Sequence, residues 1–242
     1  MRNHHRGEKV PKLIILLPTK NEEEGIREVF ERIPRDEISE MGYSTHVVIA
    51  DGRSKDKTCE IAAENGAKIV VQKGPDGKGT GVREALEIIF QEDDNDDQTL
   101  LIMLDADATY SPEDLPRFID SLGENDVVWG SRMRGTIAKR AMSRTNRLGN
   151  WLLSMFASFV FLKRTSDLCT GYWGFRLSIL EKLDLTAEGF NLEADLFASV
   201  VKSKARTHEI AIDYAHREGE SNLKWYKDGP RILMMTIRHR FK

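Results

Sequence analysis

Residues 99–107 read TLLIMLDAD, a short apolar run that ends in two aspartates, Asp105 and Asp107. An apolar run of this length with polar residues on both sides is typical of a buried β-strand. Side chains two positions apart in an extended segment point to the same side, so both carboxylates can converge on one hard cation. Alternatively, Asp107 opens a turn and caps a helix that the residues SPED at 111–114 indicate.

Four other apolar runs are also expected to be strands, and each is followed by polar or glycine-rich residues. They are residues 12–17, which Pro18 stops, 46–50, 68–71 and 126–129. Segments with the apolar spacing of helices separate these strands, including a helix expected from about Val82 to Phe90. The alternation predicts an α/β fold with a mostly parallel, doubly wound sheet flanked by helices, whose ligands bind beyond the carboxyl ends of the strands.

The second half of the chain changes character, because residues 139–162 have helical character without a strand signal. Three arginines in this region fall at i, i+4 and i+7, so they would share one helix face. They are Arg140, Arg144 and Arg147. Shorter elements are expected further on, a strand at 171–175, a helix at 192–201 and a strand at 208–214.

The apolar run Trp151–Leu162 follows the arginines and is shorter than the roughly 20 residues needed to span a bilayer. Two locations are open for it. It can be a buried core helix, or it can lie in a membrane interface without spanning it, as the amphipathic tail at residues 226–242 could also do.

Length and composition favour one domain, expected at residues 10–223, with a helical tail at 224–242. A net charge of -3 with 31% charged residues indicates neither a nucleic-acid binder nor a disordered chain. The two cysteines, Cys59 and Cys169, lack the spacing of metal ligands, and residues 1–9 contain no apolar segment of a signal peptide. A reducing, cytoplasmic location is therefore expected.

Six motifs resemble, in the same order, those of the inverting family 2 glycosyltransferases, and within that family the dolichyl-phosphate mannose and glucose synthases. The motifs are LPTKNEEEG (17–25), IADGRSKDKT (49–58), MLDADATYSPEDL (103–115), GSRMRG (130–135), CTGYWGFR (169–176) and YAHREGES (214–221). The resemblance implies the GT-A fold, with a C-terminal helical region for the acceptor and the membrane interface. It also implies that a hexose passes from a GDP-mannose or UDP-glucose type of donor to a polyprenyl (dolichyl) phosphate.

The resemblance further implies a set of residues that bind the nucleotide sugar. These are Pro18, Lys20, Asn21, Glu22, Asp51, Lys78, Asp105, Ala106 and Asp107. Asn21 would fix the turn after the first strand, although Asn21 or Thr19 could instead cap the following helix. Many relatives have a second Asp where this chain has Gly52, which leaves the base of the donor open. Lys78 could reach a phosphate, but its surroundings are not a Walker A loop.

Asp105 and Asp107 resemble the Asp-x-Asp motif that holds Mg²⁺ or Mn²⁺ against the donor diphosphate in this family. Such a cation neutralises the charge that develops on the leaving nucleoside diphosphate. Thr109 stands where related synthases can carry a further metal ligand, and a water molecule could take its place.

A phosphate acceptor carries about -1.5 to -2 charge at pH 7, so it needs cations rather than a general base. The resemblance assigns the acceptor phosphate to Arg132, Arg140, Ser143 and Arg217, and it makes Asp107 and Arg217 the catalytic residues. The guanidinium group of an arginine can donate two parallel hydrogen bonds to two oxygens of one phosphate. If the acceptor were instead a hydroxyl group, Glu193 or Asp195 could act as the base, although either could also cap a helix.

The expected partners are a nucleotide sugar, a polyprenyl phosphate and the cytoplasmic face of a membrane, to which the enzyme would bind peripherally. Nucleic acid is not expected. Three alternatives stay open, a soluble sugar or glycan acceptor, a sugar-phosphate nucleotidyltransferase and a non-catalytic subunit. The second is disfavoured because PTKNEEEG lacks a glycine-rich loop with an arginine, and the third because Asp105, Asp107 and Arg217 are intact.

Overall fold

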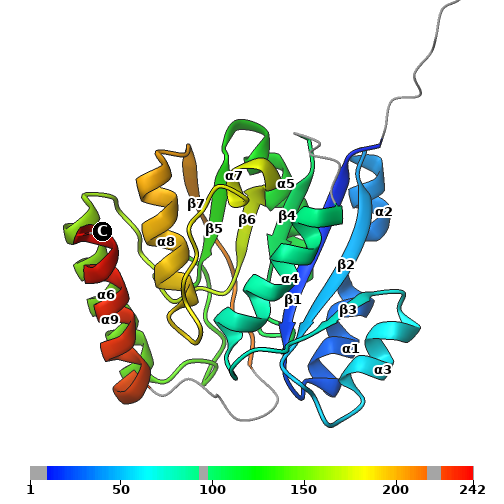
Figure 1. The fold of residues 1–242 in the computed structure, drawn as a ribbon, viewed down its shortest axis with the longest axis horizontal. Coiled ribbons are helices and arrows are strands. Elements are labelled where there is room, and N and C mark those ends of the chain that lie inside the picture. The colour runs from blue at the N-terminus through cyan, green and yellow to red at the C-terminus, as the bar shows by residue number, and fades with distance from the viewer. Residues whose placement is uncertain (1–9, 93–97, 217–224, 242) are drawn as a thin grey trace, which may run out of the picture.

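A seven-stranded sheet forms the centre of the molecule, in the order β3-β2-β1-β4-β6-β5-β7 (Figure 1). The structure is a computed structural model that describes residues 10–92, 98–216 and 225–241. The strands are β1 (Lys12–Thr19), β2 (Ser44–Asp51), β3 (Lys68–Val71), β4 (Leu100–Met103), β5 (Val127–Ser131), β6 (Trp173–Arg176) and β7 (Thr207–Ala211). Strand β6 runs antiparallel to β4 and β5, and the other pairs are parallel. The predicted α/β fold with a mostly parallel sheet is confirmed.

Helices cover both faces of this sheet. They are α1 (Glu23–Arg32), α2 (Arg35–Glu40), α3 (Thr58–Glu64), α4 (Lys78–Glu92), the 3-10 helix η1 (Pro112–Asp114), α5 (Leu115–Glu124), α6 (Arg144–Phe161), α7 (Leu177–Leu180), α8 (Leu192–Ser203) and α9 (Trp225–Phe241). Along β1, Ile14 and Leu16 join the core under α4 and α8, whereas Leu13, Ile15 and Leu17 join the core under α1 and α5. A strand buried on both faces needs apolar residues at every position, which explains the unbroken run in the sequence.

Strand β1 continues through Pro18 to Thr19, so the prediction that Pro18 stops it is wrong. Pro18 is aligned with Ala50 of β2, but β4 pairs with β1 only from Leu13 to Leu16. The missing N–H group of Pro18 therefore lies beyond the β4 ladder, where proline costs a strand little.

Helix α6 begins at Arg144, five residues later than the helical region predicted from the sequence. Ser143 ends the preceding segment because its hydroxyl group accepts the backbone N–H of Asn146 at 3.1 Å, as an N-cap does. Arg140 lies before this cap in the left-handed conformation, with φ of 69°. The prediction that Arg140 shares a helix face with Arg144 and Arg147 is therefore wrong.

The exposed side of α6 is apolar. The side that faces the molecule carries Asn150, Ser154 and Ala157, whereas Met155 and Phe159 are 52% and 77% exposed. The interpretation of the apolar run as a buried core helix is therefore wrong for its exposed side, which carries Met155 and Phe159. We call the exposed apolar residues of α6 and α9 the α6–α9 apolar surface. It comprises Leu148, Trp151, Leu152, Met155, Phe159, Leu162, Leu233, Met234 and Ile237.

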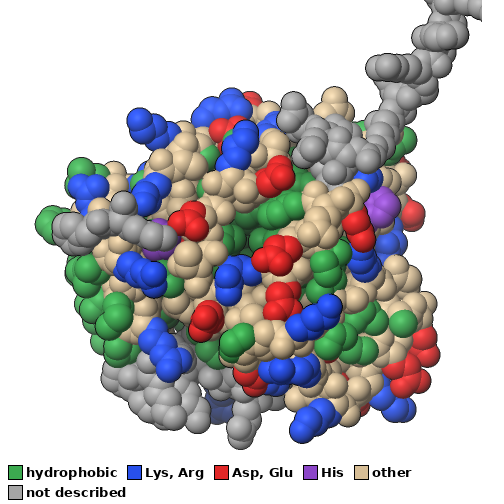
Figure 2. Space-filling model, viewed as in Figure 1, with side chains coloured by type: hydrophobic (Ala, Val, Ile, Leu, Met, Phe, Trp, Pro, Cys, Tyr) green, Lys and Arg blue, Asp and Glu red, His purple; other side chains and the backbone are tan. Residues whose placement is uncertain are grey.

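Figure 2 shows apolar side chains along the edge of the molecule where Figure 1 places α6 and α9. Acidic and basic side chains are interspersed over the rest of that face, so no single-sign patch forms there. Among the described helices, none is long and apolar enough to cross a membrane.

Helix α9 packs on α6 and α8, and its buried side contains Ile232, Met235 and His239. His239 Nε2 lies 2.5 Å from Asp195 Oδ1, and both side chains are almost fully buried. The other oxygen of Asp195 accepts the backbone N–H groups of Thr186 and Ala187, each at 2.6 Å. Asp195 is thus a structural residue and not the general base considered above. The expected domain boundary after residue 223 falls outside the described residues and stays a prediction.

We expect His239→Ala to lower the free energy of unfolding by about 3 kcal/mol, because it leaves Asp195 Oδ1 buried without its side-chain partner. Urea denaturation followed by circular dichroism measures this change. The matched control is Arg238→Ala, since Arg238 is the exposed neighbour on the same helix and its loss should cost under about 0.5 kcal/mol. Equal unfolding midpoints for both variants would contradict the assignment.

Candidate active site

A cleft of about 1310 Å³ runs across the carboxyl ends of β1 and β4 and on to α6 and α9. Most of the residues predicted from the sequence line it. They are Pro18, Lys20, Asn21, Glu22, Lys78, Asp105, Ala106, Asp107, Arg132, Arg140 and Ser143. Arg217, the remaining arginine of that prediction, lies outside the described residues. The fold therefore gathers into one cleft residues that are more than 120 positions apart in the chain.

Asn21 joins the turn after β1 to the loop after β2. Its φ of 54° is in the left-handed region that asparagine tolerates. Its side-chain oxygen accepts a backbone N–H of that loop at 2.8 Å, and its own N–H donates to Ser54 Oγ at 2.9 Å. At the N-terminus of α1, the N–H group of Glu22 donates to Thr58 Oγ1 at the start of α3, and that of Glu23 donates to Asp56 Oδ2 in the preceding loop. The alternative that Asn21 or Thr19 caps this helix is wrong.

Asp51 is 2% exposed and does not line the cleft. Its carboxylate accepts the backbone N–H groups of Arg53 at 3.0 Å and Ser54 at 3.2 Å, which holds the loop after β2 in place. Asp51 therefore supports a loop beside the cleft, and its direct contact with a nucleoside stays a prediction. Gly52 does line the cleft, and a Cβ atom there would lie 3.2 Å from the Cβ of Lys20. The glycine leaves room for the lysine.

Asp76 pairs with two basic residues beside the same end of the cleft. Lys20 Nζ lies 2.7 Å and Arg53 Nη2 2.8 Å from its two carboxylate oxygens. The hydrogen bond from Lys20 and the one from Arg53 lower the pKa of Asp76 to about 2. The three side chains join the segments after β1, β2 and β3.

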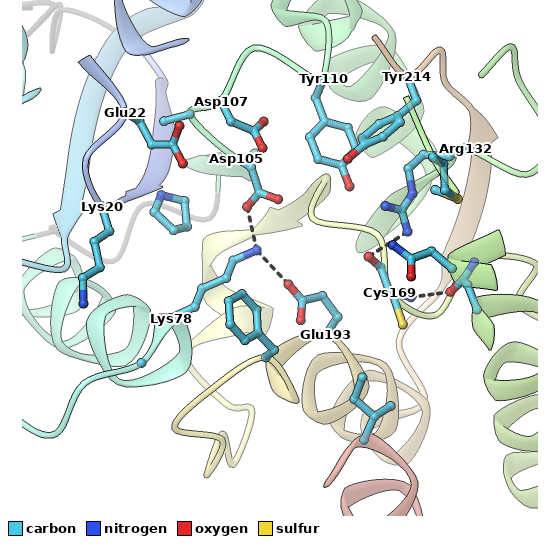
Figure 3. A pocket seen from close by; sticks show the side chains of 18 of the residues that line it. Lys20, Glu22, Lys78, Asp105, Asp107, Tyr110, Arg132, Cys169, Glu193 and Tyr214 are labelled. Atoms are coloured by element: carbon cyan, nitrogen blue, oxygen red, sulfur yellow. Dashed lines mark hydrogen bonds and ion pairs between the residues drawn. The ribbon is translucent and has the colours of Figure 1, made fainter. Parts of the chain in front are cut away.

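Lys78 lies between two acidic side chains in the middle of the cleft (Figure 3). Its ammonium group donates to Asp105 Oδ1 at 2.6 Å and to Glu193 Oε1 at 2.7 Å. Burial alone would lower the pKa of Lys78, but the two carboxylates outweigh burial and hold that pKa above its ordinary value. Burial raises the pKa of Glu193, and Lys78 offsets only part of this rise. The sequence placed Glu193 near an acceptor or at a helix cap, but it did not predict this contact.

Asp107 is 7% exposed and is oriented by Thr109. Its Oδ1 atom accepts the backbone N–H of Thr109 at 3.1 Å and the hydroxyl group at 2.5 Å. The residue between them, Ala108, turns the chain with φ of 58°. The helix that follows has Ser111 as its N-cap, so the alternative that Asp107 caps it is wrong.

Two glycines make room for the Asp-x-Asp segment. A Cβ atom on Gly25 would lie 2.6 Å from the carbonyl oxygen of Ala106, and one on Gly171 would lie 2.5 Å from Asp105 Oδ2. Both distances are too short for a real side chain. Gly25 is the last residue of the first motif quoted above, and Gly171 lies within the fifth. The sequence alone did not show what these glycines contact.

The carboxylates of Asp105 and Asp107 suit a hard divalent cation. Mg²⁺ and Mn²⁺ prefer oxygen ligands, and Mg²⁺ is commonly held by one or two carboxylates together with phosphate oxygens and water. Within the part of the chain that the structure describes, no group of three or more His, Cys, Asp or Glu residues is placed to hold a metal ion. The donor set thus fits a cation that takes its other ligands from a bound diphosphate and water.

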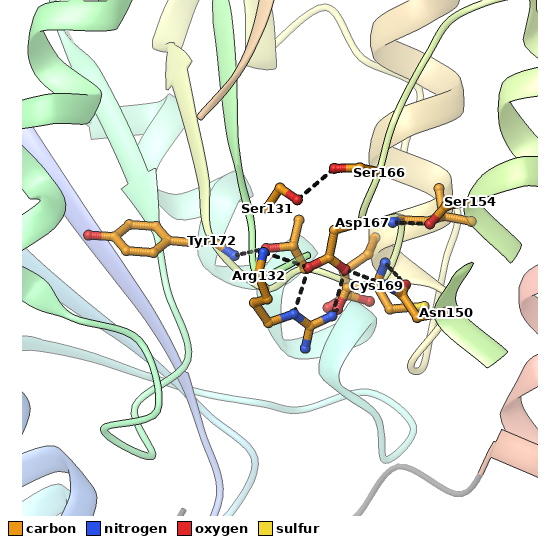
Figure 4. A network of polar contacts seen from close by, with 12 residues as sticks. Ser131, Arg132, Asn150, Ser154, Ser166, Asp167, Cys169 and Tyr172 are labelled. Carbon is orange, nitrogen blue, oxygen red and sulfur yellow. Dashed lines mark hydrogen bonds and ion pairs between the residues drawn. The ribbon is translucent and has the colours of Figure 1, made fainter. Parts of the chain in front are cut away.

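Arg132 is buried and is held by Asp167 (Figure 4). Its Nε and Nη2 atoms donate to the two oxygens of Asp167, each at 2.7 Å, and Nη2 also donates to the carbonyl of Cys169 at 2.8 Å. The guanidinium group lies over the ring of Tyr214, 5.1 Å from its centre. Burial would lower the pKa of Arg132, but Asp167 outweighs it. Arg132 lines the cleft, and its contact with an acceptor stays a prediction. The sequence analysis did not predict that Asp167 would be its partner.

The family of the chain follows from comparison with known proteins. Residues 14–184 match the family described as Glycosyl transferase family 2. The low-salt glycan biosynthesis hexosyltransferase Agl6 of Haloferax volcanii is 34% identical over 97% of this chain, which spans 57% of that relative. A dolichyl-phosphate hexose transferase from the same organism is 33% identical over 93% of this chain and 92% of its own length.

A solved structure has a similar fold. Glucosyl-3-phosphoglycerate synthase from Mycobacterium tuberculosis, in complex with Mn²⁺, uridine diphosphate and glucosyl-3-phosphoglycerate, superposes with a TM-score of 0.68 at 19% identity. The match covers 95% of this chain and 80% of that one. Together with the six motifs and the cleft, the match over residues 14–184 shows that the chain belongs to glycosyl transferase family 2.

Proposed function

We propose that the protein transfers a hexose from a nucleoside diphosphate sugar to a polyprenyl phosphate, with inversion at the anomeric carbon. The observation that carries the proposal is the continuity of the cleft. It begins at the turn around Asn21, passes Asp105 and Asp107, and ends between α6 and α9 at Leu152 and Leu233. A polar end, which we assign to the donor, and an apolar end, which we assign to the acceptor, therefore share one cavity.

At the donor end, the chain's own residues bind and orient the nucleotide sugar. The turn around Asn21 would border the nucleoside, and Asp105 and Asp107 would hold Mg²⁺ or Mn²⁺ against the diphosphate. When bound, this cation would neutralise the charge of the leaving nucleoside diphosphate. The M. tuberculosis synthase, which shares the fold, was solved with Mn²⁺ and uridine diphosphate. Lys78 lies within 2.6 Å of Asp105 and would face the same phosphates.

At the acceptor end, cations rather than a general base are needed, because a phosphate monoester is already anionic. Arg132 and Arg140 line this part of the cleft, together with Ser143, and Arg217 follows the described strand β7 in sequence. The nearby carboxylate of Glu193 is bound to Lys78. The relative from Haloferax volcanii that covers most of both chains is named a dolichyl-phosphate hexose transferase.

The α6–α9 apolar surface supports a lipid acceptor and a peripheral location at the cytoplasmic face of a membrane. Leu152 and Leu233 belong both to this surface and to the lining of the cleft. Trp151 and Phe159, which are 53% and 77% exposed, would enter the interface between lipid headgroups and acyl chains. The phosphate would then lie at the membrane surface with its hydrocarbon below.

A soluble, phosphate-bearing acceptor is the second candidate. It is favoured by the likeness to the M. tuberculosis synthase, which has also been solved with phosphoglyceric acid. The exposed apolar residues of α6 argue for the lipid. A panel of GDP- and UDP-sugars with Mn²⁺, assayed with polyprenyl phosphate, with phosphoglyceric acid or with neither, decides between them. Nucleoside diphosphate release that depends on polyprenyl phosphate supports the proposal, and release with phosphoglyceric acid alone refutes it.

We expect Asp107→Asn to lower turnover about a hundredfold or more, because it weakens the hold on a cation that contributes several kcal/mol to the transition state. The amide oxygen can still accept the bonds from Thr109, so the fold should persist. Nucleoside diphosphate release at saturating metal measures the effect. Asp120→Asn is the matched control, because Asp120 is exposed on α5 away from the cleft. Near wild-type turnover in Asp107→Asn would rule out the metal assignment.

Arg217→Ala should cost about 2 to 5 kcal/mol in kcat/KM for polyprenyl phosphate, if this arginine pairs with the acceptor phosphate. Arg217→Lys should recover only part of this loss, because lysine cannot bind two phosphate oxygens as a fork. Steady-state kinetics with a soluble short-chain polyprenyl phosphate measure both variants. Unchanged kcat/KM in Arg217→Ala would remove the residue from the site.

Met155→Glu with Phe159→Glu should abolish binding to liposomes that contain anionic lipid, because both side chains are exposed on α6. The same change should impair transfer to a long polyprenyl phosphate more than to a short, soluble one, since the donor residues are untouched. The control is Val10→Glu with Val71→Glu, which alters two exposed apolar residues away from α6 and α9 by the same charge. If the α6 variant floats with liposomes as strongly as the control variant does, the α6–α9 apolar surface is not the membrane-binding surface.

A further inference from the structure

The ion pairs of Lys78 occupy part of the site where a metal is expected. The Lys78 side chain is 13% exposed, and its ammonium group contacts Asp105 Oδ1 at 2.6 Å and Glu193 Oε1 at 2.7 Å. Figure 3 shows the lysine reaching from α4 to a position between the two carboxylates. A cation that binds through Asp105 Oδ1 would have to displace this ammonium group.

The lysine is held in place by its own backbone. It is the first residue of α4, and the N–H group of Thr80 in the same turn donates to the carbonyl of Glu188 at 3.0 Å. A Cβ atom on Gly79 would lie 2.5 Å from the carbonyl oxygen of Ala187, so the two segments are in direct contact. The backbone at the start of α4 is thus packed against residues 187–188, and the long side chain of Lys78 is the flexible part of this arrangement.

The metal site is incomplete without a nucleotide. Asp105 and Asp107 supply two carboxylates, and no third acidic or histidine ligand joins them among the residues that the structure covers. A diphosphate would add oxygen ligands for the metal, and its negative charge would attract the ammonium group of Lys78. One anionic ligand would thus complete the metal site and draw the lysine away from Asp105.

We propose that Lys78 is an internal competitor of the metal ion, which blocks Asp105 until a nucleoside diphosphate binds and draws the ammonium group to its phosphates. Glu193 keeps the lysine beside the site in both arrangements. The inference deepens the proposed function and rests on it. Metal and nucleotide then bind cooperatively, because each favours the arrangement in which Lys78 has left Asp105.

The test is the affinity for Mn²⁺ without nucleotide, followed by electron paramagnetic resonance of the free ion. Lys78→Met should bind Mn²⁺ about ten- to a hundredfold more tightly than wild type, the range set by losing one charge-assisted hydrogen bond to Asp105. Lys20→Met is the matched control. It removes the same charge from the same cleft, but Lys20 pairs with Asp76 and not with Asp105, so Mn²⁺ affinity should change less than about twofold.

A second variant separates displacement of the lysine from a simple change of charge. Lys78→Met with Glu193→Gln keeps the local net charge and leaves no unpaired carboxylate at Glu193, so it also guards against unfolding of the single variant. It should still bind Mn²⁺ more tightly than wild type. Mn²⁺ affinity equal to wild type in the double variant would overturn the proposal, because tighter binding in Lys78→Met alone would then reflect only the change of charge.

Titrations with GDP and with UDP complete the experiment. In wild type the nucleotide that the site accepts should raise the affinity for Mn²⁺, and this increase should be smaller in Lys78→Met because the competitor is already gone. An increase of the same size in both proteins would count against the proposal. If wild type binds neither GDP nor UDP in the presence of Mn²⁺, the proposed function is overturned. The comparison of Mn²⁺ affinities without nucleotide decides the role of Lys78 whether or not a nucleotide binds.

Discussion

The contacts of Lys78 with Asp105 and Glu193 hold three separate segments of the chain together in the middle of the cleft. They join the start of α4, the end of β4 and the first turn of α8, which are separated by up to 115 positions in the sequence. A buried ammonium group requires partners, because an unpaired charge in a protein interior is very costly. The shape of the cleft therefore depends on an arrangement of charges that also suits a cation and a diphosphate.

Much of the fold could be predicted from the sequence, because each strand is a short apolar run that the sheet buries on both faces. Strand β3 has the predicted bounds, Lys68–Val71, and the five strands of the first half appear in the predicted order along the chain. The antiparallel place of β6 between β4 and β5 was not predicted. Strand neighbours are chosen by packing between distant segments, which a local pattern does not contain.

The site shows the same division. The pair Asp105 and Asp107 could be predicted because the two residues stand close together in the segment that follows one strand, β4. The partners Glu193 and Asp167 could not, since each is brought to its contact by a distant element. Helix α6 was ambiguous for a further reason: a run of large apolar residues looks the same in sequence whether it faces a core or a lipid surface, and here the small and polar residues face inward.

The most direct test of the account follows the sugar itself. Wild-type protein with Mn²⁺ and polyprenyl phosphate is given GDP-mannose or UDP-glucose labelled in the hexose, and the mixture is extracted with organic solvent. The account predicts that the label from one donor moves to the organic phase as an acid-labile lipid phosphate hexose, and that omission of the polyprenyl phosphate prevents this. Label that stays in the aqueous phase with every donor while nucleoside diphosphate is released would contradict a lipid acceptor.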